Sequence, residues 1–407
     1  MLGEIVATVA FGVWVYLLVG RGGFWLAAER DTRDEPGPPR TWPRVVAVIP
    51  ARDEAETIGA TIESLLGQAY AGPFSIVLVD DESRDGTAEA ARAAAAQAAG
   101  RLTVLPGRPL PAGWTGKLWA VHQGVAHATS TPESPDYLLL TDADITYAPD
   151  ALARLVGRAQ ASGTVLTSLM AKLRCVSLAE RAFVPAFVYF FQMLYPFAWV
   201  NRRRYAMAGA AGGCMLVRPD ALQAAGGIAA IRGALIDDCA LGAALKKQGP
   251  IWLGLTDRVT SARPYDHIGD IRRMVARSAY AQLGYSPLNL VGTTLGMGLT
   301  FLAGPIMALV GHGLAQMLGF ATWALIALSY QAMLRFYRGS PLWGPALPAI
   351  ALAYMAFTLD SAYQHGRGRG GLWKGRVQAQ PQAQTQAHAD ARADAQAGAG
   401  AKVAEQK

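Results

Sequence analysis

Two carboxylates at the end of an apolar run are the clearest candidates for chemistry in this sequence. Asp142 and Asp144 directly follow residues 137–140 (Tyr-Leu-Leu-Leu), which predict a buried strand. Residues i and i+2 of an extended chain face the same way, so both carboxylates can address one cation. Hard divalent cations such as Mg²⁺ take oxygen ligands and often share them with substrate phosphates. A solvated turn is the alternative, because this spacing is common by chance.

A second acidic site, at Asp80 and Asp81, follows the apolar run 75–79. So much charge after a buried strand is costly unless it is solvated or used in binding. A carboxylate there can accept hydrogen bonds from a nucleobase or from ribose hydroxyls. In the simpler interpretation, the loop only caps the next helix, through Ser83, Asp85 or Thr87.

Two glycine-containing segments are candidates for contact with a ligand. Residues 113–117 end in Lys117, whose point charge can neutralise a diphosphate, although the GxxxxGK[ST] spacing of a P-loop is absent. Gly212 and Gly213 lead into a predicted strand, and glycine there permits a close approach of backbone to ligand.

Asp237 and Asp238 precede a predicted helix with apolar residues at Leu241 and Leu245. Acidic residues stabilise a helix N-terminus in any case. The functional interpretation makes one of them a general base that deprotonates an acceptor hydroxyl.

A histidine and three arginines lie just before an apolar stretch. His267 is a candidate metal ligand, although a lone histidine is more often structural. Arg272, Arg273 and Arg277 either clamp a phosphate or meet lipid headgroups.

Alternating strands and helices must position these residues. Apolar runs predict strands at 45–49, 75–79, 102–105 and 137–140. Helical patterns begin near Glu54 and cover 88–99. This alternation predicts an α/β fold with a mostly parallel sheet and helices on both faces. Ligands bind outside the carboxyl ends of the strands of such sheets, so we expect three segments to meet, namely 50–54, 80–85 and 141–144.

The composition indicates membrane segments around this domain. Hydrophobic residues make up 52% of the chain and charged residues only 16%, whereas soluble domains have about 25% charged residues. A helix needs about 20 apolar residues to cross a bilayer, and runs near this length occupy 5–20, 288–311, 314–334 and 342–359. For the first run a signal peptide is the alternative, but the positive n-region and a convincing cleavage site are missing.

Positive charge predicts the orientation of these segments. Basic residues mark the cytoplasmic side of a span, so Arg30, Arg33, Arg40 and Arg44 place the α/β domain in the cytosol. Basic clusters also follow the last two runs, and three full crossings cannot bring both clusters to the cytoplasm. We therefore expect residues 288–311, which Gly and Pro interrupt, to be re-entrant.

An aromatic segment at 183–200 is interrupted by Pro185 and Pro196. It predicts an interfacial helix pair against the membrane, where a lipid acceptor can enter, or alternatively a buried core helix. The domain boundaries that follow are a membrane anchor at 1–28, a linker at 29–43, the α/β domain at 44–284, membrane segments at 285–362 and a basic, then Ala/Gln-rich disordered tail at 363–407.

The net charge of +7 leaves nucleic acid, an anionic membrane or an anionic substrate as partners. Nucleic acid is disfavoured, because zinc-finger spacing, RNP-like motifs and dense Lys/Arg blocks are missing. The three cysteines have no CxxC pair and are interpreted as reduced, small apolar residues of a cytosolic domain, at Cys175, Cys214 and Cys239.

Together, these motifs resemble the family 2 glycosyltransferases of the GT-A fold over about residues 44–280. The resemblance rests on their order and spacing: Val48–Glu54, Asp80–Ser83, Asp142–Asp144, Gly212-Gly213 and Asp237-Asp238. Within that family the chain looks most like the hopene-associated glycosyltransferases of bacterial hopanoid gene clusters. Residues 277–286 and the flanking membrane segments support this closer match.

The resemblance implies a role for each motif. Asp144, with Asp142, would bind Mg²⁺ or Mn²⁺ at the diphosphate of a nucleotide-sugar donor, for which a UDP-sugar is favoured. Asp238 would be the base of an inverting displacement. The acceptor would be a lipid, in a multi-pass protein of the bacterial inner membrane with a cytoplasmic catalytic domain. The nucleotide pocket would involve Pro50, Arg52, Glu54 and either Asp80 or Asp81.

Departures from the family pattern narrow the function. Asp53 and Asp237 stand where Asn and Glu are commoner, and neither change removes needed chemistry. The Gln/Arg-x-x-Arg-Trp motif of processive synthases is not met, because Met274 and Ser278 occupy its first and last positions around Arg277. This disfavours a processive polysaccharide synthase. A non-catalytic membrane scaffold that retained the fold is disfavoured by the intact carboxylates.

Overall fold

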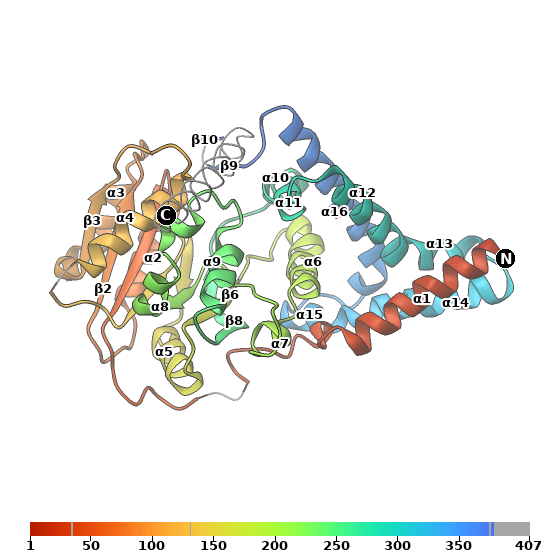
Figure 1. Ribbon diagram of the computed structural model, residues 1–407, viewed down its shortest axis with the longest axis horizontal. Coiled ribbons are helices and arrows are strands. Elements are labelled where there is room, and N and C mark those ends of the chain that lie inside the picture. The colour runs from red at the N-terminus through yellow and green to blue at the C-terminus, as the bar shows by residue number, and fades with distance from the viewer. Residues whose placement is uncertain (34–35, 131, 374–375, 378–407) are drawn as a thin grey trace, which may run out of the picture.

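The computed structural model describes residues 1–33, 36–130, 132–373 and 376–377. An α/β domain forms one end of the molecule, and a helical projection with the N-terminus at its tip forms the other (Figure 1). The predicted Ala/Gln-rich part of the tail lies outside the described residues.

One eight-stranded sheet forms the centre of the α/β domain, in the order β3-β2-β1-β4-β7-β6-β8-β5. The first four of these strands are parallel, as predicted, whereas β7 runs antiparallel to both β4 and β6, and β5 antiparallel to β8. The sheet is therefore mixed. The strands are β1 (Val45–Ala51), β2 (Phe74–Asp80), β3 (Leu102–Pro106), β4 (Tyr137–Leu140), β5 (Ile145–Tyr147), β6 (Leu166–Lys172), β7 (Met215–Val217) and β8 (Ile251–Ser261).

Helices cover both faces of the sheet because alternate residues of its central strands point to opposite sides. Val45, Ala47 and Ile49 of β1 pack with α2 and α5, whereas Val46 and Val48 pack with α4. The predicted helix 88–99 is shorter than expected, since a kinked 3₁₀ segment replaces its second half. The elements are α2 (Ala55–Leu66), α3 (Thr87–Ala94), η2 (Ala96–Arg101), α4 (Gly116–Thr129), α5 (Ala151–Ser162), α8 (Pro219–Ala224), η3 (Ile228–Ile231) and α9 (Asp237–Lys246).

The described residues contain five helical segments that are long and apolar enough to cross a membrane: Leu2–Gly20, Leu178–Val200, Pro287–Val310, Gly313–Phe336 and Trp343–Gly366. Four of them confirm predicted apolar helices. Their elements, with the short helices beside them, are α1 (Leu2–Gly20), η1 (Phe24–Leu26), α6 (Leu178–Leu194), α7 (Phe197–Val200), α10 (Ile268–Ala276), α11 (Ala279–Gln282), α12 (Pro287–Met297), η4 (Gly298–Leu302), α13 (Ala303–Val310), α14 (Gly313–Ser329), α15 (Gln331–Phe336) and α16 (Trp343–Gly366). A short hairpin follows, with strands β9 (Leu372–Trp373) and β10 (Arg376–Val377).

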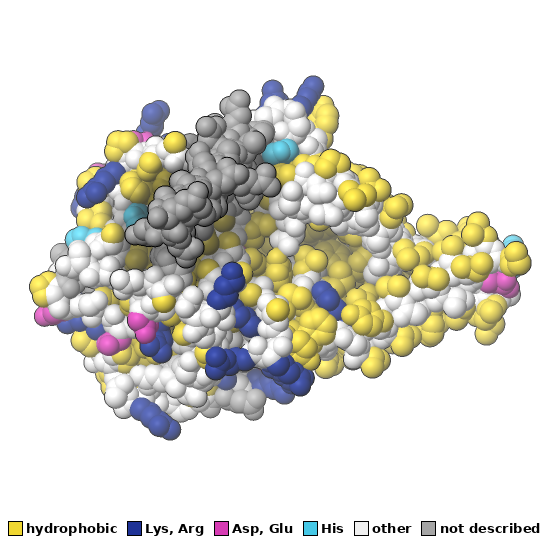
Figure 2. Space-filling view, viewed as in Figure 1, with side chains coloured by type: hydrophobic (Ala, Val, Ile, Leu, Met, Phe, Trp, Pro, Cys, Tyr) yellow, Lys and Arg dark blue, Asp and Glu magenta, His cyan; other side chains and the backbone are white. Residues whose placement is uncertain are grey.

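The projection consists of α1 packed beside the α13–α14 hairpin (Figure 1). Glycine allows the two hairpin helices to approach closely: a Cβ at Gly319 would lie 2.3 Å from the nitrogen of Ala308, and one at Gly304 would lie 2.6 Å from Thr322 Cγ2. The outer surface is largely apolar (Figure 2), with exposed side chains that include Leu2, Ile5, Leu309, Val310, Leu314, Met317 and Phe320. A π-helical turn joins α12 to α13, so 287–310 is a helical run with the length and composition of a candidate span, and its re-entrant course stays a prediction.

The aromatic segment forms one long helix and one short helix. Pro185 lies inside α6 and does not end it, so the predicted interruption there is wrong; the helix ends before Pro196. One face of α6 is buried, and the hydroxyl of Tyr189 bonds that of Ser329 at 2.7 Å. Glu180, also fully buried, accepts from the backbone N–H of Tyr265 at 2.9 Å. The contacts thus fix α6 both to the projection and to the segment that follows β8.

The position of α4 depends on a glycine. A Cβ at Gly124 would lie 2.5 Å from Val48 Cγ1 on β1, so a larger residue would push the helix away from the sheet. Replacement by alanine is expected to lower the free energy of unfolding by about 1–3 kcal/mol through overpacking. Gly59→Ala in α2 is the control, because nothing lies within 4 Å of its Cβ position. Thermal unfolding compares them, and a Gly124→Ala protein as stable as wild type would contradict this close packing.

Candidate active site

A cavity of about 520 Å³ lies where the carboxyl ends of β1 and β4 meet α4, α6, α9 and α10. Eleven of the residues predicted from the sequence line it: Pro50, Glu54, Lys117, Asp142, Asp144, Gly212, Gly213, Asp237, Asp238, Arg273 and Arg277. The structure thus brings together motifs that are more than 200 residues apart in the chain. The lining does not include Arg52, Asp80, Asp81 or His267.

Lys117 joins two of the predicted acidic sites. Thr115 caps α4 by accepting from the Leu118 N–H at 3.3 Å, which places Lys117 in the first turn, at the carboxyl ends of the strands. Its Nζ lies 2.8 Å from Asp142 Oδ1 and 3.0 Å from Asp237 Oδ2. Burial alone would lower the pKa of Lys117, but the charges of Asp142 and Asp237 outweigh it and raise that pKa. The ammonium is therefore permanently charged.

Asp238 lies beside this bridge but is not part of it. Its Oδ2 accepts from the Gly212 N–H at 3.0 Å, and its Oδ1 accepts from the Cys239 N–H at 2.7 Å. Burial, followed by the charge of Asp237, raises the pKa of Asp238 to about 6. A carboxylate with a pKa near the operating pH is suited to take up a proton during a reaction.

Arg263 is a member of the site that the sequence analysis missed. It follows β8, and its Nε donates to Asp144 Oδ2 at 2.8 Å while its Nη2 donates to Glu54 Oε1 at 2.7 Å. Asp144 is buried and also accepts from Ser261 Oγ at 3.3 Å. The two carboxylates raise the pKa of Arg263, with Asp144 the larger influence, although burial opposes them. An arginine two residues after the end of β8 was the only available sequence signal.

The two aspartates that were predicted to hold a metal fit a divalent cation that also has phosphate ligands. Asp142 and Asp144 both line the cavity. Burial and the nearby charge of Asp144 raise the pKa of Asp142 even though Lys117 touches it and opposes the shift. Asp142 shares the single ammonium of Lys117 with Asp237, so the cluster still carries more negative than positive charge, and a cation would balance it. Mg²⁺ is commonly held by one or two carboxylates together with substrate phosphates.

A site formed by the protein alone is not found. In the part of the chain that the structure describes, no three His, Cys, Asp or Glu side chains are placed to hold a metal ion. His267, the other predicted ligand, is exposed and precedes α10, where its backbone N–H donates to Asp270 Oδ2 at 2.9 Å. This position fits the alternative to metal binding, which is a structural role for His267.

The predicted nucleotide-binding loops interlock beside the cavity. Arg52 Nη1 donates to the backbone carbonyl of Asp81, whose side chain is buried. Asp80 Oδ1 accepts from the Ser83 N–H at 3.1 Å. Asp85 accepts from the Ala55 and Thr87 N–H groups, and those bonds lower the pKa of Asp85 although burial opposes them. Segments 50–54 and 80–85 therefore meet as predicted. The N-cap of α3 is Gly86, without a side-chain cap bond, and Asp85 instead links the first residues of α2 and α3.

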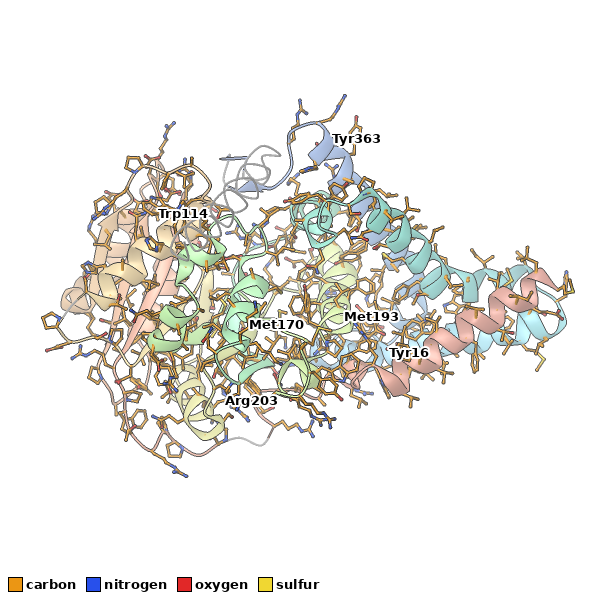
Figure 3. The ribbon with its side chains drawn as sticks, viewed as in Figure 1. Tyr16, Trp114, Met170, Met193, Arg203 and Tyr363 are labelled. Carbon is orange, nitrogen blue, oxygen red and sulfur yellow. The ribbon has the colours of Figure 1, made fainter. Side chains whose placement is uncertain are left out.

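The wall of the cavity that faces the helices combines aromatic and basic side chains. Phe187 and Phe191 come from α6, and Arg273, Met274 and Arg277 come from α10 and the residue after it. Arg273 pairs with Asp270, which also lines the cavity. In Figure 3, Met170, another lining residue, lies between the sheet and α6. The cavity thus has a charged side at the strand ends and a mixed apolar and basic side toward the helices.

Comparison with known proteins identifies this domain. Residues 46–226 match the model of the family described as Glycosyl transferase family 2. Over these residues the α/β domain is similar to that family, and its fold is the GT-A fold. Among curated proteins, none matches the chain in sequence.

Solved structures resemble the chain to different extents. A mannosyltransferase from Pyrobaculum calidifontis, solved with GDP-Man and Mn²⁺, is 20% identical, with 92% of this chain and 100% of that chain covered and a TM-score of 0.53. Glucosyl-3-phosphoglycerate synthase from M. tuberculosis is 20% identical, with 60% and 81% covered and a TM-score of 0.36. TarS from S. aureus, solved with UDP-GlcNAc, is 14% identical, with 80% and 92% covered and a TM-score of 0.39. The first likeness shows a fold shared over the α/β domain and the helices.

Removing the Arg263 side chain tests its part in the site. Arg263→Met is expected to lower the free energy of unfolding by about 1–3 kcal/mol, because the buried carboxylate of Asp144 loses a charged donor. The matched control is Arg218→Met, whose ion pair with Asp220 is largely exposed and should contribute less than about 1 kcal/mol. Denaturant unfolding at pH 7 measures both, and equal losses in the two variants would contradict the assignment.

Proposed function

We propose that the protein is a membrane-bound, inverting glycosyltransferase that moves one sugar from a nucleotide-sugar donor to the hydroxyl of a lipid acceptor. The observation that carries this proposal is that Asp238 lines one cavity together with the Lys117-linked carboxylates and with Phe187 and Phe191 of α6. A base in that cavity shares it with donor chemistry and with an apolar, helix-lined wall.

The donor is proposed to bind at the strand ends. The nucleoside is held on the side of Arg52, Asp80 and Asp81, with Pro50 and Glu54 at the border of the cavity. The diphosphate reaches Lys117, whose charge suits it, and the carboxylates of Asp142 and Asp144. An Mg²⁺ or Mn²⁺ ion held there supplies positive charge that stabilises the departing diphosphate.

The chain's own residues are proposed to carry out a single displacement. Asp238 takes the proton of the acceptor hydroxyl, and the hydroxyl oxygen forms the new bond to the anomeric carbon. The bond from that carbon to the diphosphate oxygen breaks, and its electron pair leaves with the nucleoside diphosphate. Attack from the face opposite the leaving group inverts the configuration. Gly212 orients Asp238 through its N–H, and Gly213 lines the same cavity.

The acceptor is proposed to be a lipid of hopanoid or polyisoprenoid metabolism. Phe187 and Phe191 offer it an apolar surface next to the helical projection, and Arg273 and Arg277 lie at the same wall. The proposed location is the bacterial inner membrane, with the catalytic domain, residues 44–284, in the cytoplasm, and the candidate spans support it. Residues 1–28 anchor it, and 285–362 form the membrane segments that follow.

The direct experiment is transfer by the purified full-length protein with Mn²⁺. Both UDP- and GDP-sugars are offered, since the resemblance favours UDP whereas the Pyrobaculum structure holds GDP-Man. Lipid extracts serve as acceptors, and the products are analysed for one added sugar of inverted configuration. A long-chain polysaccharide product, or no transfer and no donor hydrolysis with any sugar, would contradict the proposal.

Asp238→Asn is expected to lower kcat by about 10²- to 10⁴-fold, the usual contribution of a general base, with little change in the dissociation constant of the donor. In the wild type, kcat should fall tenfold for each pH unit below about 6, because the pKa of Asp238 is raised to about 6 and only the deprotonated form accepts a proton. Initial rates from pH 4.5 to 8 test both points. An unchanged kcat in Asp238→Asn would remove this residue from the base role.

Asp144→Asn is expected to weaken donor binding in Mn²⁺ at least tenfold and to leave the weak binding in EDTA unchanged. The physical reason is the loss of a negative ligand to the cation that links protein and diphosphate. Asp220→Asn is the control, since Asp220 lies outside the cavity in an exposed pair with Arg218. Calorimetric titration with the donor gives the affinities, and equal Mn²⁺ dependence in both variants would exclude Asp144 as a metal ligand.

A further inference from the structure

Three consecutive arginines follow α7 and have no part in the proposed catalytic site. Arg202, Arg203 and Arg204 are exposed and are not in the lining of the cavity. Among the described residues, no ion pair is found for Arg202 or Arg203, whereas Arg204 Nη2 donates to the hydroxyl of Tyr205 at 3.0 Å. Adjacent like charges repel each other, so three unneutralised guanidinium groups in a row indicate an anionic partner outside the protein.

The surroundings of this arginine loop (residues 201–207) are those of a membrane–water interface. The rings of Trp199 and Tyr205 stack at 5.2 Å, and the guanidinium of Arg21 lies 5.1 Å from the centre of the Trp199 ring. Trp and Tyr are enriched where a span leaves the bilayer, and basic residues accompany them on the cytoplasmic side. The loop therefore lies at the depth where lipid headgroups begin.

Arg21 also connects this cluster to the ends of two candidate spans. It directly follows α1, and its side chain donates to the carbonyls of Met193 and Leu194, at the end of α6, at 3.2 Å each. Figure 3 places Arg203 at the lower edge of the molecule beside α7, with Tyr16 of α1 farther along the projection. In Figure 2, Lys and Arg side chains gather at this edge, next to the apolar surface of the projection.

The loop is held in shape by a lysine from the catalytic domain. Lys246, in the last turn of α9, donates to the carbonyls of Trp199, Val200, Arg202 and Met207. One ammonium group thus fixes both ends of the loop. A preorganised loop loses little conformational entropy when it binds, so its arginines are suited to bidentate contact with phosphate groups.

We propose that the arginine loop is a docking surface for the headgroups of anionic lipids in the cytoplasmic leaflet. Phosphate diesters provide the negative charge that pairs with Arg202 and Arg203. The neighbouring aromatic rings lie among the glycerol and upper acyl groups. This surface is separate from the acceptor path at Phe187 and Phe191, because it lies outside the cavity. It selects the lipids around the protein and holds α9, through Lys246, at a fixed height above the membrane.

The test measures lipid selectivity directly and needs no enzymatic activity. Full-length protein is reconstituted in phosphatidylcholine vesicles with a trace of spin-labelled phosphatidylglycerol or spin-labelled phosphatidylcholine. The motionally restricted fraction of each label gives their relative association constants. The wild type should prefer phosphatidylglycerol, and the preference should decrease as salt rises, because screening weakens the attraction.

The double variant Arg202→Gln/Arg203→Gln should reduce that preference roughly fivefold or more, since each arginine near an anionic surface adds to binding. The matched control, Arg92→Gln/Arg108→Gln, removes the same charge at exposed positions in and beside the α3–β3 part of the domain. This control should retain the wild-type preference for phosphatidylglycerol. The proposal is overturned if the loop variant keeps the wild-type preference, or if the control loses as much. Because no turnover is measured, either result is independent of the glycosyltransferase assignment.

Discussion

The double ion pair of Lys117 is the interaction on which the site depends. It joins Asp142, at the end of β4, to Asp237, at the start of α9. These carboxylates would repel each other in a partly buried cavity without the ammonium between them. Lys117 therefore fixes the distance between the end of β4, which carries a proposed metal ligand, and the start of α9, which carries the proposed base. The close packing of α4, which Gly124 permits, places the lysine there.

A second network fixes the opposite side of the cavity in the same way. Arg263 connects Glu54, after β1, with Asp144, after β4. Asp238 is not part of either network. Burial and the charge of Asp237 raise its pKa, and they outweigh the charge of Lys117 and the N–H groups of Cys239 and Gly212, which lower it. Asp238 therefore remains available to exchange a proton.

The sequence predicts the first half of the sheet well because its strands are continuous apolar runs, and the structure confirms all four. The meeting of Pro50 and Asp142 follows from the rule that ligands bind at carboxyl ends of parallel strands. The rule does not cover Asp238, which begins α9. Arg263 was not predictable, because its place depends on the pairing of β8 with β5 and β6, which lie far away in sequence. Pro185 was misleading, since contacts of α6 with the projection stabilise a helix that local sequence rules would end.

The most direct measurement of the central role of Lys117 is the affinity of Lys117→Met for a nucleotide-sugar donor in Mn²⁺, by calorimetry on the full-length protein. Lys247→Met, an exposed lysine just after α9, is the matched control. The predicted result is at least a tenfold weaker affinity for Lys117→Met alone, because Asp142 and Asp237 then repel each other and the diphosphate loses its fixed positive partner. Wild-type affinity in a folded Lys117→Met protein would contradict the central role of Lys117.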